Sequence, residues 1–406
     1  MKNVGVKIAL YLNYFMFAIL LNSVGIVIFK SQKNYGVDEV QASILEAFKD
    51  MPIAIVSFLI ASFLPRIGYK KAMLIGLALV TMACIGMYFG NSFNTAKILF
   101  ATVGVSFALI KVSVYSLIGT VTENKKEHNA LMSSVEGVFM IGIALTYFLF
   151  PFFNNENDPN SWLNVYWLLA VMSALSFVFL FFTKFEKNEE IQKTNLSDDF
   201  SQMFKLITKL LIIVFVISAF LFVMIEQGIM TWLPTFNQKV LHLKDNISIM
   251  MASILAISLA IGRIIAGVVT KKIDWIWVLT FCIVCAMLIV VFVLPRTVGL
   301  EVREINSLGD IPLIGFAFPI VGLFISPIYP LLNSVVLSAL PKNQHSAMTG
   351  LIVVFSALGG TLGSRTIGWL FKNQGPENAF YFTLIPMTLL LIAFFILKKL
   401  TAKNEI

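Results

Sequence analysis

The sequence predicts an all-α polytopic membrane protein, with twelve transmembrane helices arranged in two six-helix bundles. Of its 406 residues, 58% are hydrophobic and only 13% are charged, whereas soluble domains carry about 25% charged residues. The apolar runs are continuous and close to the roughly 20 residues that a helix needs to cross a bilayer. They are longer than the short, alternating strands of a membrane barrel, so helices are expected.

The hydrophobic runs fall into two sets of six. The first set covers residues 6–29, 39–64, 72–91, 96–121, 131–152 and 163–183. The second covers residues 207–233, 246–269, 275–294, 311–338, 346–371 and 379–397. The polar segment 184–206 predicts a cytoplasmic linker between an N-terminal bundle, 1–183, and a C-terminal bundle, 207–406. The first run is long enough to remain as a span, so no cleaved signal peptide is expected.

The basic residues predict the orientation of these spans. With the N-terminus inside, 18 Lys and Arg residues lie on its side of the membrane, 8 lie opposite and 4 lie within spans. Cytoplasmic loops carry the excess of positive charge. The chain is therefore expected in the cell (inner) membrane with both termini cytoplasmic. The same loops explain the net charge of +8 without nucleic acid as a partner.

The stretch from Ala42 to Leu64 is apolar enough to span a bilayer, yet it carries Glu46, Lys49 and Asp50. Their spacing of three and four residues places all three on one face of a helix. Ionisable groups in a span are costly and face protein or water rather than lipid. Two interpretations stay open: a self-neutralised structural cluster, or the polar wall of a substrate cavity.

Lys111 lies near the middle of the fourth predicted span, too deep to reach either membrane surface easily. It needs an acid, a carbonyl or an anionic ligand. A pair with Asp50 or Glu136 is the structural interpretation, and a substrate or coupling role is the functional one. Buried carboxylates can bind and release protons near neutral pH, so Glu46, Asp50 and Glu136 are candidates for proton coupling.

The seventh span carries Glu226, Gln227 and Trp232, an acid, an amide and an indole that suit a hydroxyl-rich ligand. Trp232 is equally typical of an interfacial aromatic belt. Further candidates for substrate binding are Asn22 in the first span, Asn333 in the tenth and Arg365 in the eleventh. Arg263 in the eighth span and Arg365 can also extend to the membrane surface.

No enzyme motif occurs in the sequence. It has no nucleotide-binding glycine loop with lysine, no HExxH and no nucleophile elbow, so neither an enzyme nor an ATP-driven pump is expected. Cys282 and Cys285 lie in an apolar run without acidic or histidine neighbours, which favours packing over a metal site. No cofactor is expected.

These patterns resemble those of the major facilitator superfamily, and within it the fucose/galactose/glucose permease group of sugar:proton symporters. The superfamily's loop motif G-x-x-x-D-R-x-G-R-R is similar to ASFLPRIGYKK, residues 61–71, which keeps Arg66, Gly68, Lys70 and Lys71 as a gating loop but has Pro65 in place of the acid. The segments EQGIMTWL (226–233), IGRIIAG (261–267) and GLFISPIYPLLNSVVLSALPKN (322–343) resemble the seventh, eighth and tenth spans of the permeases.

The resemblance implies a major facilitator fold, but the coupling residues differ. In the permeases, an acid in the first span and another in the fourth carry proton coupling and sugar binding. The matching first-span region here has Asn22 and Ser23, the fourth-span acid aligns with Lys111, and a fifth-span glutamine aligns with Glu136. The acid role therefore passes to Glu46, Asp50 or Glu136, and Lys111 is free to contact an anionic group.

We therefore expect a monomeric secondary active transporter that takes up a sugar or a sugar derivative, with a proton as the coupling ion. Lys111 favours a derivative that bears a carboxylate. The alternative is a transporter or exporter of organic anions, peptides or drugs, since the 17 Met and 37 Phe residues would suit an adaptable apolar cavity. A membrane receptor is disfavoured because the C-terminal segment is short.

Overall fold

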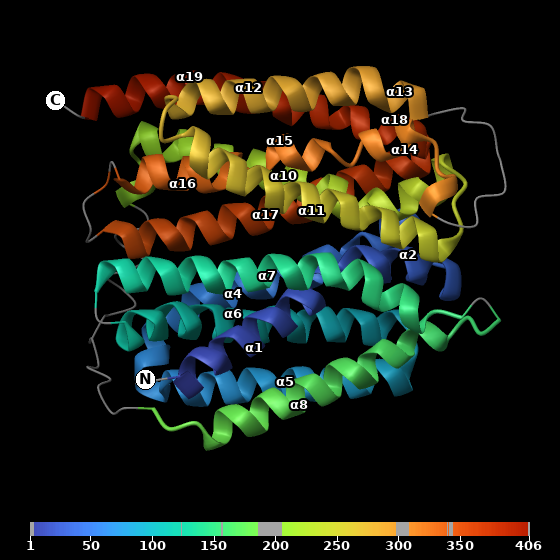
Figure 1. Ribbon diagram of the computed structural model, residues 1–406, viewed down its shortest axis with the longest axis horizontal. Helices are drawn as coiled ribbons and strands as arrows, with labels where there is room; N and C mark the ends of the chain where they lie inside the picture. Colours follow the sequence, from blue (N-terminus) through green and yellow to red (C-terminus); the bar gives the residue numbers. More distant parts are fainter. Residues whose placement is uncertain are drawn as a thin grey trace. The chain divides into compact units, whose positions relative to one another are not determined.

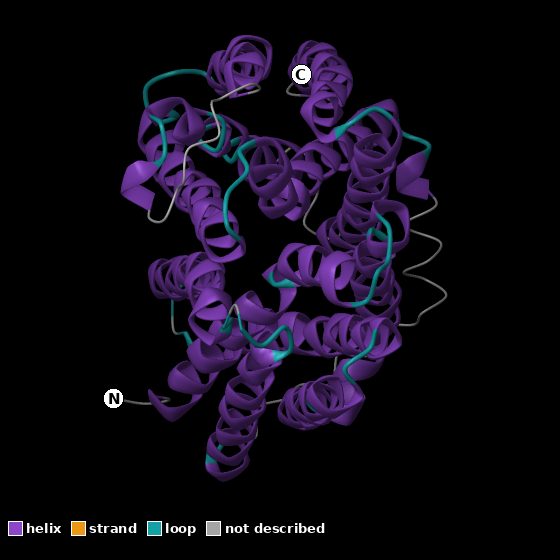
Figure 2. Cartoon of the chain, turned by 90° about the vertical axis from the view of Figure 1, so that its right-hand side faces the viewer, coloured by secondary structure: helices purple, strands orange, loops and turns teal. Residues whose placement is uncertain are grey.

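The computed structural model describes residues 4–122, 124–155, 157–185, 205–297, 308–338, 340 and 344–404. Its regular elements within these ranges are all helical (Figure 2). Eleven helices of the described residues are long and apolar enough to cross a membrane. The remaining predicted span, 39–64, corresponds to α3 (Glu39–Ala42) and α4 (Ile44–Ile67). The predicted all-α polytopic fold is confirmed.

The chain divides into two compact units. The first unit comprises Met1–Val27 and Phe48–Asp198, and the second comprises Ile28–Ala47 and Asp199–Ile406. The division falls inside α2 (Val24–Asn34) and α4, so the end of the first predicted span and the start of the second belong to the second unit. Residues 186–204 of the predicted linker lie outside the described residues, and the limits of the two bundles stay predictions.

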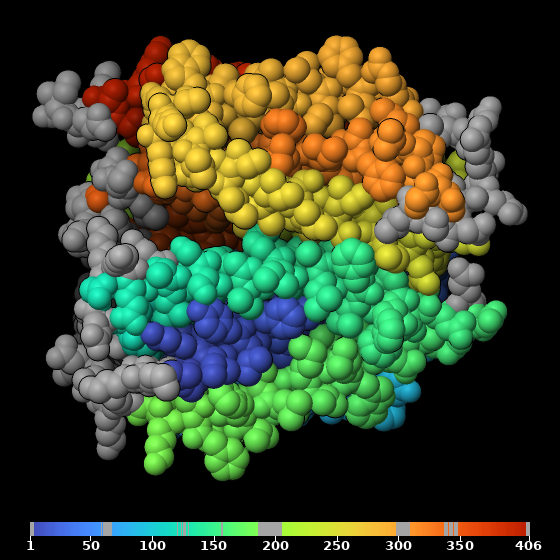
Figure 3. Space-filling view, viewed as in Figure 1, coloured from blue at the N-terminus to red at the C-terminus, as the bar shows by residue number. Residues whose placement is uncertain are grey.

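The first unit is built on α1, which is buried along most of its length. Its main helices are α1 (Val4–Asn22), α5 (Tyr69–Gly90), α6 (Phe93–Val121), α7 (Lys125–Phe153), the short η1 (Ser161–Asn164) and α8 (Val165–Phe182). Within the unit, α1 packs against α6, α7 and α8, and α5 packs against α6 and α8 (Figure 1). Figure 3 shows α1 (dark blue) on the surface between α7 (teal) and α8 (green).

The second unit is centred on α10, which packs against α11, α17 and α19. Its helices are α10 (Leu210–Val240), α11 (Asp245–Val269), α12 (Trp275–Leu288), η2 (Ile289–Val293), α13 (Leu294–Thr297), η3 (Leu308–Asp310), α14 (Leu313–Ala317), α15 (Val321–Ile325), α16 (Ile328–Ser338), α17 (His345–Asn373), α18 (Pro376–Ala379), η5 (Phe380–Thr383) and α19 (Leu384–Asn404). The predicted tenth span is broken into α14, α15 and α16, with Pro319 and Pro327 in the breaks. A proline has no backbone N–H to continue a helix.

Two glycines explain the close contact between α10 and α17. A Cβ atom on Gly359 would lie 2.3 Å from the carbonyl oxygen of Phe220, and one on Gly363 would lie 2.3 Å from that of Met224. These glycines are four residues apart and thus on one face of α17. Small residues let helix backbones approach in this way within membranes.

Candidate functional site

Lys111 lies on a face of α6 between two aromatic rings. Phe107, Lys111 and Tyr115 are spaced by four residues, which aligns their side chains along the helix. The Lys111 Nζ lies 5.7 Å from the centroid of the Phe107 ring and 5.9 Å from that of Tyr115. These are distances at which a cation interacts with a π face. Among the described residues, half-buried Lys111 forms no ion pair and no hydrogen bond.

The two acids expected as partners of Lys111 contact other residues. The Asp50 carboxylate lies 3.5 Å from the Lys49 ammonium, and both side chains are buried. The Tyr115 hydroxyl donates a hydrogen bond of 2.7 Å to Glu136 on α7. Neither acid therefore forms the ion pair with Lys111 that the structural interpretation of the sequence requires.

Close contact at Gly104 positions the backbone of Lys49. A Cβ atom on Gly104 would lie 2.3 Å from the Lys49 carbonyl oxygen. Gly104 is seven residues before Lys111 on α6, which corresponds to about two helical turns. Asp50, which follows Lys49, therefore lies near the Gly104 end of this stretch of α6 and not beside Lys111.

Aromatic side chains from three helices surround the Lys111 face. Tyr14 on α1 lies 6.1 Å from the centroids of both Phe107 and Tyr115, and 5.2 Å from that of Phe139 on α7. The Phe107 and Phe139 rings are 6.1 Å apart. We call Tyr14, Phe107, Tyr115 and Phe139 the aromatic cradle. The four-residue spacing around Lys111 was a sequence signal for two members, but Tyr14 and Phe139 join them only in the fold.

The second unit holds a separate polar cluster on α10, α11, α16 and α17. The Glu226 Oε1 lies 3.5 Å from the Arg263 Nη2. Tyr329 stacks on Phe222 with ring centroids 5.5 Å apart, and its hydroxyl lies 3.2 Å from the Ser356 Oγ. Glu226 and Arg263 were recognised in the sequence as charges in spans, whereas the roles of Tyr329 and Ser356 were missed.

Asn333 extends the polar cluster by one helical turn. It follows Tyr329 by four residues on α16, so the two side chains share a face. The Asn333 Oδ1 is buried and has no hydrogen-bond partner among the described residues. A buried acceptor without a partner is costly. The carboxylate, guanidinium, amide and phenol together can bind several hydroxyl groups of one ligand.

The segment Ile28–Ala47 is held in the second unit by ion pairs. The Lys30 Nζ lies 3.2 Å from the Asp245 Oδ2, and Lys33 also pairs with Asp245. Glu39 pairs with Lys239 of α10. Glu46 is fully buried and accepts a hydrogen bond of 3.0 Å from the Thr231 hydroxyl. We call Ile28–Ala47 the docked segment.

Asp38 is held by two kinds of donor at the start of α3. Its carboxylate accepts a bond of 2.8 Å from the Lys372 ammonium, and it caps the helix by accepting from the Gln41 N–H. Both contacts favour the charged form, and they hold the pKa of Asp38 below its ordinary value of 3.8. Because Asp38 is exposed at its surface, solvent screens this pair.

The other predicted substrate residues are dispersed. Trp232 is fully buried, and its indole N–H donates to the Ser364 carbonyl oxygen at 2.8 Å. Gln227 is half-buried beside Glu226, and Arg365 is exposed on α17. The Asn22 amide donates to the Ala18 carbonyl of its own helix at 2.8 Å. The structure brings together Glu226 and Asn333 in the second unit and Lys111 and Glu136 in the first.

The gating-loop residues lie at the junction of α4 and α5, with Gly68 between the two helices. Gly68 has a φ of +89°, a conformation that glycine adopts without strain. Lys70 donates to the carbonyl oxygens of Phe181 at 2.8 Å and Thr183 at 2.7 Å, which ties this loop to the end of α8. Lys71 is exposed, and Arg66 is in the last turn of α4, with its side chain outside the described residues.

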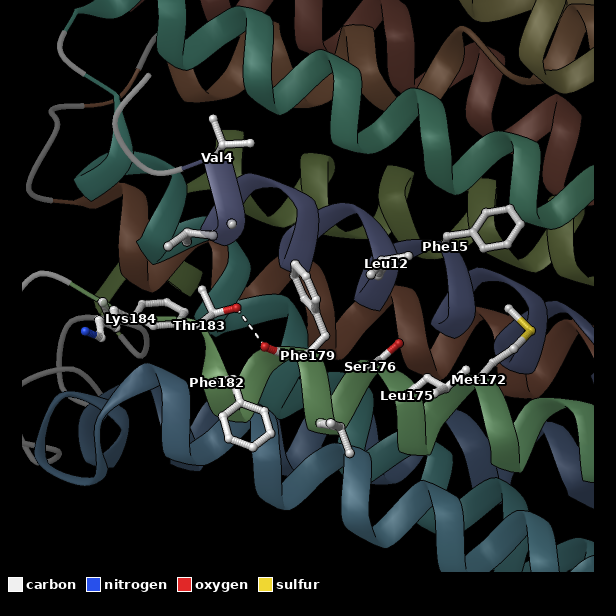
Figure 4. A pocket seen from close by; sticks show the side chains of 14 residues that line it. Val4, Leu12, Phe15, Met172, Leu175, Ser176, Phe179, Phe182, Thr183 and Lys184 are labelled. Atoms are coloured by element: carbon white, nitrogen blue, oxygen red, sulfur yellow. Dashed lines mark hydrogen bonds between the residues drawn. The ribbon is translucent and has the colours of Figure 1, made fainter.

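A groove of about 1020 Å³ runs between α1 and α8 in the first unit. Figure 4 shows apolar side chains such as Leu12 and Met172 along it, with Lys184 at one end. The lining offers only the Ser176 and Thr183 hydroxyls and this ammonium as polar side-chain groups. The groove thus lacks the density of hydrogen-bonding groups found at the two clusters described above.

Comparison with known proteins identifies the sequence family. The Major Facilitator Superfamily model matches residues 8–364. The glucose/mannose transporter GlcP of Bacillus subtilis (strain 168) is 26% identical over 264 residues. This match covers 63% of the present chain and 61% of that transporter, less than two thirds of its length.

Several solved structures share the fold at low sequence identity. A bacterial homolog of the human lysosomal transporter Spinster, inward-facing and occupied, has a TM-score of 0.77 at 12% identity, over 98% of this chain and 97% of the other. A D-xylose-proton symporter has a TM-score of 0.72 at 12% identity, over 98% and 97%. The transporter FucP in the outward conformation has a TM-score of 0.65 at 12% identity, over 98% and 99%.

Proposed function

Because the chain belongs to the Major Facilitator Superfamily, we propose that it is a secondary active transporter that takes up a sugar or a sugar derivative by alternating access, driven by protons. The observation that carries the sugar assignment is the polar cluster of Glu226, Arg263 and Asn333 beside the stacked rings of Phe222 and Tyr329. Sugars are bound by several directed hydrogen bonds together with an aromatic surface. The likeness to a glucose/mannose transporter supports the same substrate class.

Proton coupling is assigned to the buried or half-buried acids Glu46, Asp50 and Glu136. Each has a different neighbour: the Thr231 hydroxyl, the Lys49 ammonium and the Tyr115 hydroxyl. Glu136 is the first candidate to test, because its hydrogen bond to Tyr115 places it next to the ring that contacts the Lys111 ammonium.

The test of this assignment is Glu136→Gln in protein reconstituted into liposomes. Glutamine keeps a hydrogen bond to Tyr115 but cannot release a proton. We expect the variant to lose accumulation driven by a pH gradient and to keep counterflow exchange of substrate. Accumulation and counterflow of radiolabelled sugar are measured on the same preparation.

The matched control is Glu127→Gln on the same helix, whose carboxylate pairs with Lys7 at a more exposed position. It should retain both activities. Accumulation that persists in Glu136→Gln would exclude Glu136 as the coupling residue and move the assignment to Glu46 or Asp50.

An organic anion is the second candidate substrate, because Lys111 is a cation in a span without an acid partner among the described residues. A thermal-shift screen of the purified protein against neutral sugars, sugar acids, organic anions and small peptides separates these classes. A ligand stabilises the state to which it binds, so the class that raises the unfolding temperature identifies the substrate.

A further inference from the structure

The Lys111 ammonium is a positive charge that forms no ion pair and no hydrogen bond with the described residues. It lies in a helix that crosses the membrane, where an ionised side chain is costly unless a partner or water stabilises it. The contacts it makes are with the π faces of Phe107 and Tyr115. An aromatic face attracts a cation more weakly than a carboxylate does, so it leaves the ammonium able to bind an anion.

The two neighbouring acids, Asp50 and Glu136, do not form an ion pair with the Lys111 ammonium. The Asp50 carboxylate forms an ion pair with Lys49, and the Glu136 carboxylate accepts a hydrogen bond from the Tyr115 hydroxyl. Tyr115 therefore has two functions: its ring supports the Lys111 ammonium, and its hydroxyl fixes the carboxylate of Glu136. This keeps the two opposite charges close in the unit without an ion pair between them.

We propose that Lys111 binds the carboxylate of the transported substrate, which is a sugar acid rather than a neutral sugar. This inference rests on the proposed transport function and specifies its substrate class. The substrate carboxylate lies on the Lys111 Nζ, beside the aromatic cradle. An ammonium is a point charge that binds a carboxylate from several directions.

The charge of the site favours a carboxylate over a phosphate. A phosphate group carries up to two negative charges and is typically bound by arginine forks, several cations or a helix N-terminus. Among the described residues, Lys111 is the one cation that contacts the cradle, and the neighbouring Glu136 carboxylate would repel a dianion. A monoanionic sugar acid, such as a hexuronate, matches one ammonium.

The experiment compares D-glucuronate and D-galacturonate with D-glucose and D-galactose in proteoliposomes. The wild-type protein is expected to bind and exchange a hexuronate at least about tenfold better than the matching neutral sugar, which corresponds to one charge-assisted contact. Lys111→Met should lower hexuronate exchange by a similar factor. Lys111→Arg should keep part of it, because the charge remains while its geometry changes.

Lys97→Met is the matched control on the same helix. The Lys97 ammonium also lies over a ring four residues earlier, 4.6 Å from the Phe93 centroid, but near the start of α6. The Lys97→Met substitution should leave hexuronate exchange unchanged. Thermal unfolding of each variant checks that its fold is retained, and the wild-type selectivity gives an answer that needs no variant.

Two results would overturn the inference in distinguishable ways. If the wild type and Lys111→Met exchange a neutral sugar equally well and ignore hexuronates, the carboxylate assignment fails and the sugar transporter stands. If the wild type exchanges no sugar of either class, the proposed function fails and the inference fails with it.

Discussion

The indole of Trp232 has the contacts of a packing residue. Its ring is 0% exposed and lies 5.1 Å from the Phe371 ring centroid. A Cβ atom on Gly368 of α17 would lie 2.5 Å from the edge of the indole ring, so a larger residue at this position would collide with the ring. The Ser364 carbonyl oxygen satisfies the indole N–H. A ligand would have to displace these neighbours to reach the ring.

We therefore expect Trp232→Phe to keep substrate exchange while lowering stability. The variant loses one buried hydrogen bond and part of the ring volume, a cost of about 1–3 kcal/mol. Thermal unfolding in detergent measures the loss, and proteoliposome exchange measures function. Trp369→Phe, on the same helix but 49% exposed, is the control and should change neither. If the Trp232→Phe variant lost exchange while its stability stayed unchanged, Trp232 would instead be assigned to the substrate site.

At the residue scale, the sequence identified the charged groups but not their partners. Lys111, Glu136, Glu226 and Asn333 were recognisable because polar side chains are rare in apolar runs. The contacts that define them join residues far apart in the chain, such as Tyr115 with Glu136. Spacing along one helix could have revealed Phe107 and Tyr115 around Lys111, but no local pattern specifies a partner on another helix.

At the scale of elements, hydropathy predicted the helices well because the bilayer forces every span to satisfy its own backbone. The observed helices differ from the predicted spans at a serine in the first span and at prolines in the tenth. The first span is interrupted at Ser23, between α1 and α2, where the serine hydroxyl donates to the Leu20 carbonyl. Prolines break the tenth span. Helix starts also follow local rules, since Ser92 and Thr95 form a capping box at the start of α6.

The docked segment shows what hydropathy cannot predict. Lys30, Lys33 and Lys239 counted in the sequence as loop charges of one membrane side. In the structure, Lys30 and Lys33 pair with Asp245, and Lys239 pairs with Glu39. These pairs hold the end of the first predicted span and the start of the second against α10 and α11 within the second unit.

We expect Asp245→Asn to weaken the docked segment. The change leaves the largely buried Lys30, whose side chain is 5% exposed, without this acid, at a cost of about 1–3 kcal/mol. Thermal unfolding measures the cost, and cleavage by protease or labelling of an introduced cysteine near residue 36 measures opening of the segment.

Asp274→Asn is the matched control for this experiment. Asp274 pairs with Lys398 at 3.6 Å, but the two side chains are 50% and 43% exposed, so their contribution to stability is small. Equal effects of the two substitutions would show that the Asp245 pairs are only screened surface contacts.

At the scale of the whole molecule, the sequence predicted the all-helical membrane fold and the family, but not the division into contact units. Chain order assigns residues 28–47 to the first half, whereas their contacts assign them to the second unit. Side-chain pairing across the chain decides this, and it leaves no periodic signal. The distribution of Lys and Arg among the loops, in contrast, can be read from the sequence, and it predicts the orientation of the entire chain in the membrane.

Contacts in the first unit gather its loops at two ends. At one end, Lys7 of α1 pairs with Glu127 of α7 at 2.7 Å, and Lys70 bonds to Thr183 after α8. The loop after α5 meets that before η1 at the other end, through a hydrogen bond of 3.1 Å between Asn91 and Asn160. The first end is rich in lysine, as the cytoplasmic side of a membrane protein should be.

We therefore expect both termini in the cytoplasm. Green fluorescent protein fused after residue 406 should fluoresce, since it folds in the cytoplasm, and alkaline phosphatase fused there should be inactive. Phosphatase fused after residue 157, in the loop before η1, should be active outside. The reverse pattern at both positions would overturn the orientation while leaving the helices in place.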